Sequence, residues 1–252
     1  MTRRRFYAPP IAFSPGATAV KLSPDETRHL RDVLRLRIGD QAYVFNGEGH
    51  EFRCVVQAIE ADSTTLQIFE ESEAGSPESP LNLTLAVALL KGEKFDLVVQ
   101  KATELGVNQI IPIVTARADV KMTTTADAEK KRARWQRIAL EATKQCGRAR
   151  LMKVDAPLSF ADLIEHPREN NELRLMFAER GGDQFALAFE SVSQAASVTA
   201  IVGSEGGWTD EEIKQARAAG WKIVTLGGRI MRAETAAIAI AALLQHRFGD
   251  LV

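Results

Sequence analysis

From residue 83 onward, apolar runs alternate with segments whose apolar residues recur at helical spacing. Five runs are almost wholly apolar, at residues 83–90, 109–114, 173–177, 198–202 and 222–226. Unbroken apolar strands of this kind are typical of parallel sheets, which are buried on both faces. The segments between them predict helices over residues 95–105, 129–145 and 209–219. Strands that alternate with helices predict an α/β domain with a parallel sheet covered by helices on both faces.

Residues 233–244 form one more predicted helix, which is apolar on nearly every side after its first turn. A helix of this kind is normally buried all round. The burial can come from the rest of its own domain or from a second copy of the chain, because the many alanines allow another helix to approach closely. The pattern leaves both alternatives open.

The chain before residue 72 has shorter strand signals between turn residues, at 43–45, 52–59 and 65–69. One helix is well marked there, with Ser23 as a candidate N-cap, Pro24 at the first helical position and Glu26 placed to close a capping box. We expect an apolar face on this helix formed by Leu30, Val33 and Leu34. A second face should carry Arg28, Arg31 and Arg35. Together these signals predict a small β-barrel with one helix, a common nucleic-acid-binding fold.

A polar segment separates the two patterns. Residues 72–80 read SEAGSPESP, with two prolines and one glycine, which is typical of a linker. We therefore expect a β-barrel domain over residues 1–72, a linker over 73–80 and the α/β domain over 81–252.

The composition excludes several classes of protein. The chain of 252 residues is 45% hydrophobic and 26% charged, which is typical of globular proteins. The longest apolar run, residues 236–244, is far shorter than the ~20 residues that span a bilayer. Two cysteines and four scattered histidines support neither a disulfide scaffold nor a metal site, so no metal is expected. We expect a soluble, cytoplasmic protein.

The formal net charge of −1 hides strong segregation of charge. Residues 1–37 hold eight Lys or Arg against three acids, and residues 121–153 hold ten against three. Two basic tracts on a balanced chain indicate contact with a phosphate backbone. The alternative is that both tracts are merely solvated faces.

Two glycine-containing loops follow predicted strands, where ligands bind in open parallel sheets. Residues 202–208 read VGSEGGW and residues 226–235 read LGGRIMRAET. Neither is a dinucleotide fingerprint or a P-loop. Glu205 would place a carboxylate beside a bound phosphate, and the loop has no lysine to offset it. A ligand with cationic or neutral hydrogen-bonding groups fits better, unless Gly206 and Gly207 only form a tight turn.

These loops resemble a known family. VGSEGGWTDEE is similar to the I-G-P-E-G-G-[FW]-[ST]-x-x-E element, and LGGRIMRAETA to the L-G-x-R-I-L-R-x-E-T-A element, of the ribosomal RNA small subunit methyltransferase E family, which belongs to the SPOUT superfamily. The segments LLKGEKFDLVVQKATELGV, IIPIVTAR, EATKQCGRAR, RRFY and HLRDVLRLRIGD also resemble family segments, so most of the chain is covered. Ser204 stands where the family usually has proline, which frees a fixed φ, and Met231 replaces leucine.

The resemblance implies a PUA-like N-terminal domain and a C-terminal SPOUT domain threaded as a trefoil knot. It implies methylation of N3 of a uridine, uridine 1498, in 16S ribosomal RNA, with S-adenosyl-L-methionine (SAM) as cofactor. SAM would bind in the knot, mainly through backbone groups of three loops. Carried onto this chain, the cofactor-binding residues are Phe177, Ala178, Glu179, Val202, Gly203, Glu205, Gly206, Gly207, Leu226, Gly227, Gly228, Ile230 and Met231.

The implied chemistry needs the reacting atoms in line and a stabilised charge on the deprotonated uracil ring. Arg232 suits the electrostatic role because its guanidinium stays charged, while Glu205 and Glu234 are candidate general bases. The target uridine should be unstacked, in a loop or single strand.

The expected partners are 16S ribosomal RNA, within the small ribosomal subunit, and a second copy of the chain. The predicted RNA-binding residues are Arg5, Arg28, Arg31, Arg35, Lys91 and Arg148. SPOUT enzymes pair through the knotted domain, so a homodimer is expected. One alternative function is a non-catalytic ribosome-binding or assembly factor with the same fold. Another is an unrelated nucleotide-binding enzyme, which would leave the basic tracts unexplained.

Overall fold

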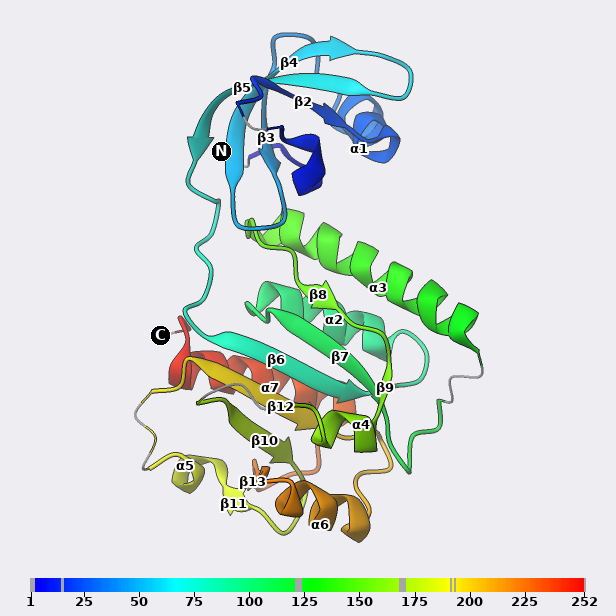
Figure 1. The fold of residues 1–252 in the computed structure, drawn as a ribbon, viewed down its shortest axis with the longest axis vertical. Helices are drawn as coiled ribbons and strands as arrows, with labels where there is room; N and C mark the ends of the chain where they lie inside the picture. The colour runs from blue at the N-terminus through cyan, green and yellow to red at the C-terminus, as the bar shows by residue number, and fades with distance from the viewer. Residues whose placement is uncertain are drawn as a thin grey trace. The chain divides into compact units, whose positions relative to one another are not determined.

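The computed structural model describes residues 3–14, 16–120, 124–167, 171–190, 192 and 194–251. The chain forms two compact units, each shown in Figure 1. The first comprises Met1–Glu78 together with Thr143–Leu151, and the second comprises Ser79–Ala142 with Met152–Val252. The segment Thr143–Leu151, which nothing in the sequence sets apart, thus belongs with the first unit.

The first unit is a curled five-stranded sheet with short helices. Its strands are β1 (Arg5–Tyr7), β2 (Ala19–Leu22), β3 (Gln41–Phe45), β4 (Glu51–Ile59) and β5 (Thr64–Ser72). They lie in the order β1-β3-β4-β5-β2, with β1 parallel to β3 and the other pairs antiparallel. A 3-10 turn, η1, covers Pro10–Ala12. One core cluster, which includes Phe6, Leu30, Val44 and Leu66, forms the interior of this unit.

The helix of the first unit is shorter than the sequence predicts. The helix α1 (Pro24–Arg28) begins as expected, because Ser23 Oγ accepts a hydrogen bond from the Glu26 N–H at 3.3 Å. The capping box, however, does not form. The Glu26 carboxylate instead pairs with the Lys144 ammonium and accepts a hydrogen bond from the Tyr7 N–H.

After α1 the chain continues as a π-helical turn, η2 (His29–Val33), in which the Leu34 N–H donates to the His29 carbonyl five residues back. The wider turn breaks the 3.6-residue period. The predicted apolar face is therefore wrong at Val33, which is 65% exposed, although Leu30 is fully buried. The single basic face is also wrong, because Arg35 lies beyond the helical turns with a φ of 53°.

The second unit is an eight-stranded sheet in which every described pair is parallel, which confirms the predicted fold class. Its longer strands are the five predicted ones, β6 (Asn82–Ala88), β7 (Gln109–Val114), β10 (Leu173–Phe177), β12 (Ser197–Val202) and β13 (Lys222–Thr225). Three two-residue strands add to its edges, β8 (Lys153–Val154), β9 (Leu158–Ser159) and β11 (Asp183–Gln184). The order across the sheet is β11-β13-β10-β12-β6-β7-β8, with β9 also on β7.

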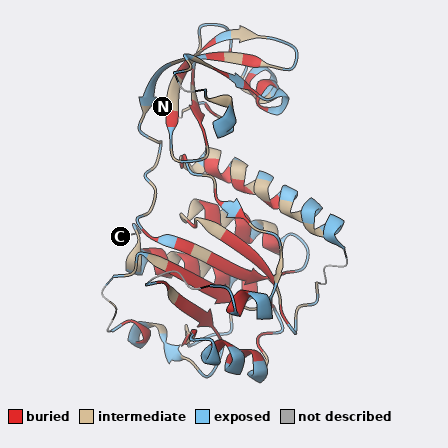
Figure 2. Ribbon diagram, viewed as in Figure 1, coloured by how far each residue is buried: buried red, intermediate tan, exposed pale blue. Residues whose placement is uncertain are grey.

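Helices cover both faces of this sheet, as predicted (Figure 1). They are α2 (Lys94–Glu104), α3 (Thr125–Cys146), α4 (Phe160–Ile164), α5 (Phe185–Ala188), α6 (Asp210–Ala218) and α7 (Ala233–Phe248). On one face α2 packs against α7, and α7 lies on β6 and β12. On the other, α4 and α6 share a core cluster with side chains from the strands. Figure 2 shows the strands buried between these layers.

A capping box forms at the start of α6. Thr209 Oγ1 accepts from the Glu212 N–H at 3.1 Å, and Glu212 Oε2 accepts from the Thr209 N–H at 2.9 Å. This capped helix fixes the end of the loop that follows β12. Because all strands are parallel, the loops after β10, β12 and β13 meet at one edge of the sheet. The chain leaves β13, beyond β10 in the sheet, and returns in α7 to β12 and β6. The trefoil knot remains a prediction.

Candidate functional site

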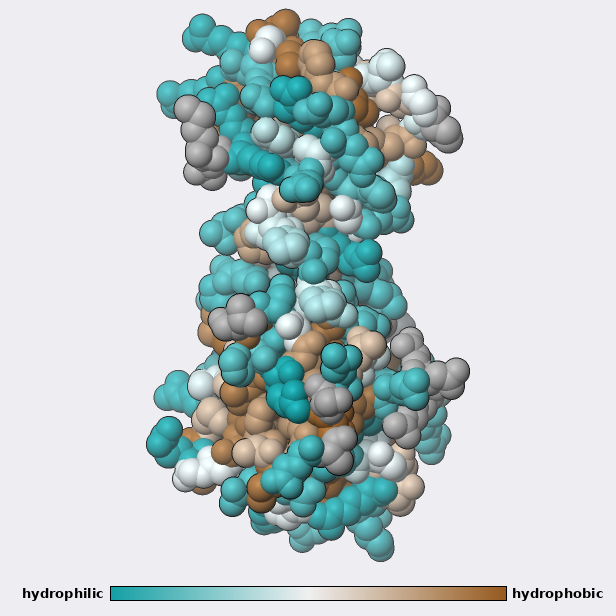
Figure 3. Space-filling model, turned by 90° about the vertical axis from the view of Figure 1, so that its left-hand side faces the viewer, coloured by the Kyte–Doolittle hydropathy of each residue, from teal (hydrophilic) through white to brown (hydrophobic). Residues whose placement is uncertain are grey.

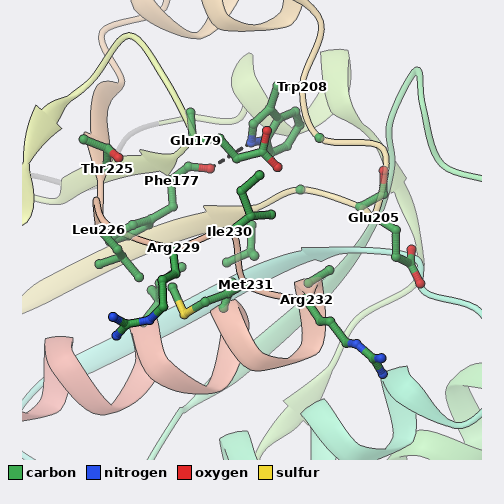
Figure 4. A pocket seen from close by; sticks show the side chains of 18 of the residues that line it. Phe177, Glu179, Glu205, Trp208, Thr225, Leu226, Arg229, Ile230, Met231 and Arg232 are labelled. Atoms are coloured by element: carbon green, nitrogen blue, oxygen red, sulfur yellow. Dashed lines mark hydrogen bonds between the residues drawn. The ribbon is translucent and has the colours of Figure 1, made fainter.

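A cavity of about 420 Å³ lies at the carboxyl ends of β10, β12 and β13, closed on one side by the start of α7 (Figure 4). Twelve of the thirteen predicted cofactor-binding residues line it, all except Gly206. The sequence did not single out the other lining residues as cofactor contacts: Ser204, Trp208, Thr225, Arg229, Arg232, Ala233, Ala236 and Ile240. The three loops predicted from the family resemblance therefore meet around one cavity.

Trp208 joins two of the three loops. Its indole Nε1 donates a hydrogen bond to the Phe177 carbonyl at 2.8 Å, drawn as a dashed line in Figure 4. A Cβ atom at Gly203 would lie only 3.0 Å from the Trp208 ring. The Trp208 indole packs directly on the backbone of Gly203, so any side chain at this position would crowd the ring. This packing fixes the wall of the cavity formed by the loop after β12.

The two glycines that follow have different roles. Gly207 has a φ of 65°, and its N–H donates to the Ser204 carbonyl at 3.0 Å, so it completes a tight turn that favours glycine. A Cβ atom there would lie 3.2 Å from the Glu179 carboxylate, inside the cavity lining. At Gly206, by contrast, a Cβ atom would meet Arg117, 2.9 Å from its Cβ and 3.0 Å from its carbonyl oxygen. The Cα of Gly206 thus faces the loop after β7, and Gly206 is not among the residues that line the cavity; a backbone contact of Gly206 with the cofactor remains a prediction.

The cavity carries charges of both signs, with Glu179, Glu205, Arg229 and Arg232 in its lining. Arg232 is the N-cap residue of α7 and is exposed, so its guanidinium is available to a substrate (Figure 4). Glu179 is one of the cofactor-binding residues expected from the family resemblance, and Arg229 lies within the third of the expected loops, residues 226–231. This mixture of charges suits a ligand with both cationic and anionic groups.

Glu205 is paired with a residue that the sequence analysis missed. Lys94 Nζ donates to Glu205 Oε1 at 2.8 Å. Burial would raise the pKa of Glu205, but the hydrogen bond from Lys94, hydrogen bonds from backbone N–H groups and the Lys94 charge outweigh it, so the pKa is lowered. A carboxylate with a lowered pKa is a weaker base, which argues against proton abstraction by Glu205.

Glu234, the other candidate base, lies in the first turn of α7 and is buried. It is not among the residues that line the cavity, and its Oε2 atom is shielded from solvent with no hydrogen-bond partner. The burial argues against proton abstraction by Glu234 as well. Lys94 lies 3.8 Å from Glu234 Oε2, so one ammonium faces both carboxylates.

The predicted RNA-binding residues divide into two groups. Arg28, Arg31 and Arg35 are exposed on the first unit; Arg28 pairs with Asp25, and Arg31 with Asp32 and the Ala61 carbonyl. Lys91, on the second unit, is exposed and pairs with Asp119 at 2.7 Å. These four side chains remain accessible to a nucleic acid.

Arg5 and Arg148 are buried, and their predicted RNA contacts are corrected. Arg5 donates to both carboxylate oxygens of Glu51 and to the carbonyls of Thr143, Lys144 and Arg148. Arg148 pairs with Glu78 at 2.8 Å. Arg5 thus ties residues 143–148 to β4, and Arg148 holds the half-buried Glu78 after β5, so neither buried guanidinium is exposed to RNA.

The part of the chain that the structure describes holds neither a metal cluster nor a membrane-crossing helix. Within those residues, no group of three His, Cys, Asp or Glu side chains is arranged to hold a metal ion. None of the described helices combines the length and the apolar character needed to cross a membrane.

Comparison with known proteins connects this site to a family. The model of the RNA methyltransferase domain family matches residues 77–245, and that of the RNA methyltransferase PUA domain matches residues 22–69. The ribosomal RNA small subunit methyltransferase E of Synechocystis is 37% identical over 218 residues, which are 86% of this chain and 69% of the relative.

Solved structures agree. The ribosomal RNA small subunit methyltransferase E of Neisseria gonorrhoeae, bound to S-adenosyl methionine, matches with a TM-score of 0.88 and 31% identity over 99% of this chain and 100% of that one. A methyltransferase of Legionella pneumophila in complex with SAM matches with a TM-score of 0.89 and 33% identity over the whole of both chains. With matches to both domains and along nearly all of its length, the chain belongs to the ribosomal RNA small subunit methyltransferase E family of RNA methyltransferases.

Proposed function

We propose that this protein transfers a methyl group from SAM to N3 of a uridine in 16S ribosomal RNA, uridine 1498 by the family resemblance. The observation that carries the proposal is the cavity in which three loops meet beside Arg232. The substrate is expected in the small ribosomal subunit, and the reaction in the cytoplasm, where that subunit is assembled.

The residues around the cavity fit SAM. The volume of about 420 Å³ lies in the range of small-molecule sites. Leu226, Ile230 and Met231 offer apolar surface to an adenine ring, and Ile230 is 89% exposed, so it is free to cover a ligand. The carboxylates of Glu179 and Glu205 suit the positive charges of the sulfonium and ammonium groups. When bound, SAM supplies an electrophilic methyl group.

The chain's own residues would orient the uracil and stabilise its charge. Uracil N3 must lose its proton to solvent water before it can attack a methyl group, and the negative charge left on the ring spreads to the carbonyls. Arg232, exposed at the rim, would meet that charge with a guanidinium that stays protonated. Since Glu205 has a lowered pKa and Glu234 is buried, we assign the main role to electrostatic stabilisation by Arg232 and none to a carboxylate base.

The first unit would bind the RNA. Its sequence matches the PUA domain of RNA methyltransferases, and Arg28, Arg31 and Arg35 expose three guanidiniums on it. Arginines of this kind contact phosphates and fix the register of a nucleic acid without reading its sequence. Lys91, on the loop after β6, would contact RNA near the cavity.

A homodimer is part of the same proposal. The helix α7 buries Ala237, Ile240, Ala241 and Leu244 within its own unit. A second stripe on α7 stays half-buried and apolar: Ile238, Ala239, Ala242 and Leu243. Figure 3 shows apolar side chains gathered on one face of the second unit. Apolar surface of this kind supports pairing with a second copy of the chain.

The test uses the full chain, SAM with an isotope-labelled methyl group, and small ribosomal subunits that lack methylation at this uridine. Deproteinised 16S RNA serves as a second substrate. We expect label in N3-methyluridine after nuclease digestion and mass spectrometry. Arg232→Gln should lose at least about 100-fold in turnover, as loss of one charge-stabilising group does. Arg217→Gln, an exposed arginine on α6 outside the cavity lining, is the control. Absence of SAM binding by calorimetry would instead support the non-catalytic assembly factor.

A further inference from the structure

Lys94 connects three elements around the cavity. It is the first residue of α2. Its ammonium donates to Glu205 Oε1, on the loop after β12, at 2.8 Å. The same ammonium lies 3.8 Å from Glu234 Oε2, in the first turn of α7. Residues from three distant parts of the sequence therefore form one cluster, which we call the Lys94 cluster: Lys94, Glu205 and Glu234.

Glu234 needs this cation. Its Oε2 atom is buried and has no hydrogen-bond partner, and a buried charge is costly unless an opposite charge offsets it. Within the residues that the structure describes, the Lys94 ammonium forms an ion pair with it, at a distance too long for a hydrogen bond. Without Lys94, Glu205 and Glu234 would be two carboxylates with no shared counter-charge, and they would repel each other.

The positions of two functional groups depend on the cluster. Arg232 directly precedes the first turn of α7 that holds Glu234, and it is the N-cap residue of that helix. Glu205 lies in the loop after β12 and lines the cavity together with its neighbours in that loop. A displacement of about 1 Å at a reacting group can cost on the order of 100-fold in rate. The ion cluster is therefore placed where a small movement would affect turnover.

We propose that Lys94 is a positioning residue, which ties the loop after β12 to the start of α7 and so holds Arg232 and Glu205 in the arrangement needed for methyl transfer. This inference rests on the function proposed above. Lys94 acts through its neighbours, since it is not among the residues that line the cavity. Its loss should lower turnover more than cofactor binding.

The chain offers a closely matched control on the same helix. Lys101 Nζ pairs with Glu104 at 2.8 Å, as Lys94 does with Glu205, and the two lysine side chains are 38% and 35% exposed. Lys94→Gln and Lys101→Gln therefore remove the same charge and the same kind of ion pair from α2. Lys94→Arg keeps the charge and is the rescue variant.

Three activity measurements test the proposal. For Lys94→Gln we expect kcat to fall about 10- to 100-fold, with SAM affinity by calorimetry changed less than about threefold. Lys94→Arg should recover most of kcat, and Lys101→Gln should match the wild type.

Hydrogen–deuterium exchange gives a readout that needs no activity. We expect faster exchange in peptides covering residues 203–208 and 231–236 of Lys94→Gln, and no change there in Lys101→Gln. Wild-type kcat with wild-type exchange would overturn the proposal, and so would an equal loss of SAM affinity and kcat. If Lys94→Gln does not fold, Lys94→Arg and Glu205→Gln are compared in the same way, and unchanged loop exchange in Glu205→Gln overturns the proposal. If the wild type methylates no RNA, the proposed function fails, while the exchange data still decide the role of Lys94.

Discussion

The indole of Trp208 donates a hydrogen bond to the carbonyl of Phe177 at 2.8 Å, and so joins the end of β10 to the loop after β12. Both residues line the cavity. Phe177 comes from the strand end and Trp208 from the far end of the glycine loop, 31 residues later. One buried bond thus holds two walls of the site together, and it does so without a charged group.

We expect Trp208→Phe to weaken SAM binding while the fold is kept. The change removes the donor and leaves a buried carbonyl unsatisfied, which costs about 1–3 kcal/mol. Calorimetry should show about a tenfold loss of SAM affinity. Trp135→Phe is the control, because the Trp135 indole donates to Asp96 away from the cavity. It should lower the melting temperature and leave SAM affinity unchanged. Equal SAM affinities for the two variants would contradict this role of Trp208.

Gly206→Ala should also weaken SAM binding, but through Arg117 and not through lost space in the cavity. The added methyl group would lie 3.0 Å from the Arg117 carbonyl, so either the loop after β7 or the loop after β12 must shift. Gly220→Ala is a suitable control, because nothing lies within 4 Å of a Cβ atom there and only its φ of 81° is unfavourable. Both variants should lose stability in thermal unfolding, and Gly206→Ala alone should lose SAM affinity.

Replacing Arg28, Arg31 and Arg35 with glutamate should weaken RNA binding and flatten its dependence on salt. Each phosphate contact that is lost lowers the slope of log K against log salt by about 0.7–0.9. SAM affinity should not change, because the cavity is built by the second unit alone. Filter binding at several salt concentrations measures both the RNA affinity and its slope. If affinity and slope survive the triple change, these arginines are only solvated.

The sequence predicted the α/β fold because its five main strands are nearly continuous apolar runs, which are stable only when both faces of a strand are buried. It could not predict β8, β9 or β11, since two-residue strands carry no periodicity. It also failed at Val33, because nothing in the local spacing indicates that the helix widens into a π turn after Arg28. The length of apolar runs thus predicts strands well. The spacing of apolar residues does not reveal that one helical turn holds an extra residue.

The glycine loops that the sequence singled out surround the cavity, but the sequence could not say which of the adjacent glycines lines it. Gly206 and Gly207 are adjacent, and only the fold places one against Arg117 and the other beside Glu179. Lys94 was missed because it pairs with a residue 111 positions away. Arg5 was assigned to RNA because it lies in a basic tract, yet its charge is used by the buried Glu51. Local charge counts do not reveal partners that only tertiary structure brings together.

Glu205 should make the folded state sensitive to acid. Its pKa in the folded protein is lowered from the ordinary value of 4.5. A carboxyl group whose pKa is lowered by folding stabilises the folded state fully at pH values above the ordinary, unfolded-state pKa. This stabilisation is lost as the pH falls through the folded-state pKa. We therefore expect the difference in melting temperature between the wild type and Glu205→Gln to shrink as the pH falls below 4.5. A difference that stays constant down to pH values well below this range would show that the Lys94 pair contributes nothing.

The half-buried stripe of α7 should form the contact between two copies of the chain. A dimer that pairs through Ile238, Ala239, Ala242 and Leu243 should dissociate when a charge is placed there, because an unpaired carboxylate would be buried at the interface. We expect the wild type to sediment at twice 27.7 kDa and Leu243→Glu at 27.7 kDa. Val33→Glu, at an exposed apolar residue of the first unit, should remain dimeric. Mixing Arg232→Gln, which should be nearly inactive, with the triple arginine variant tests a further point: activity regained in the mixture would mean that one subunit binds the RNA on which the other acts. A wild type that sediments as a monomer at micromolar concentration would exclude both the homodimer and an active site shared between two subunits. The stripe on α7 would then be ordinary half-exposed surface.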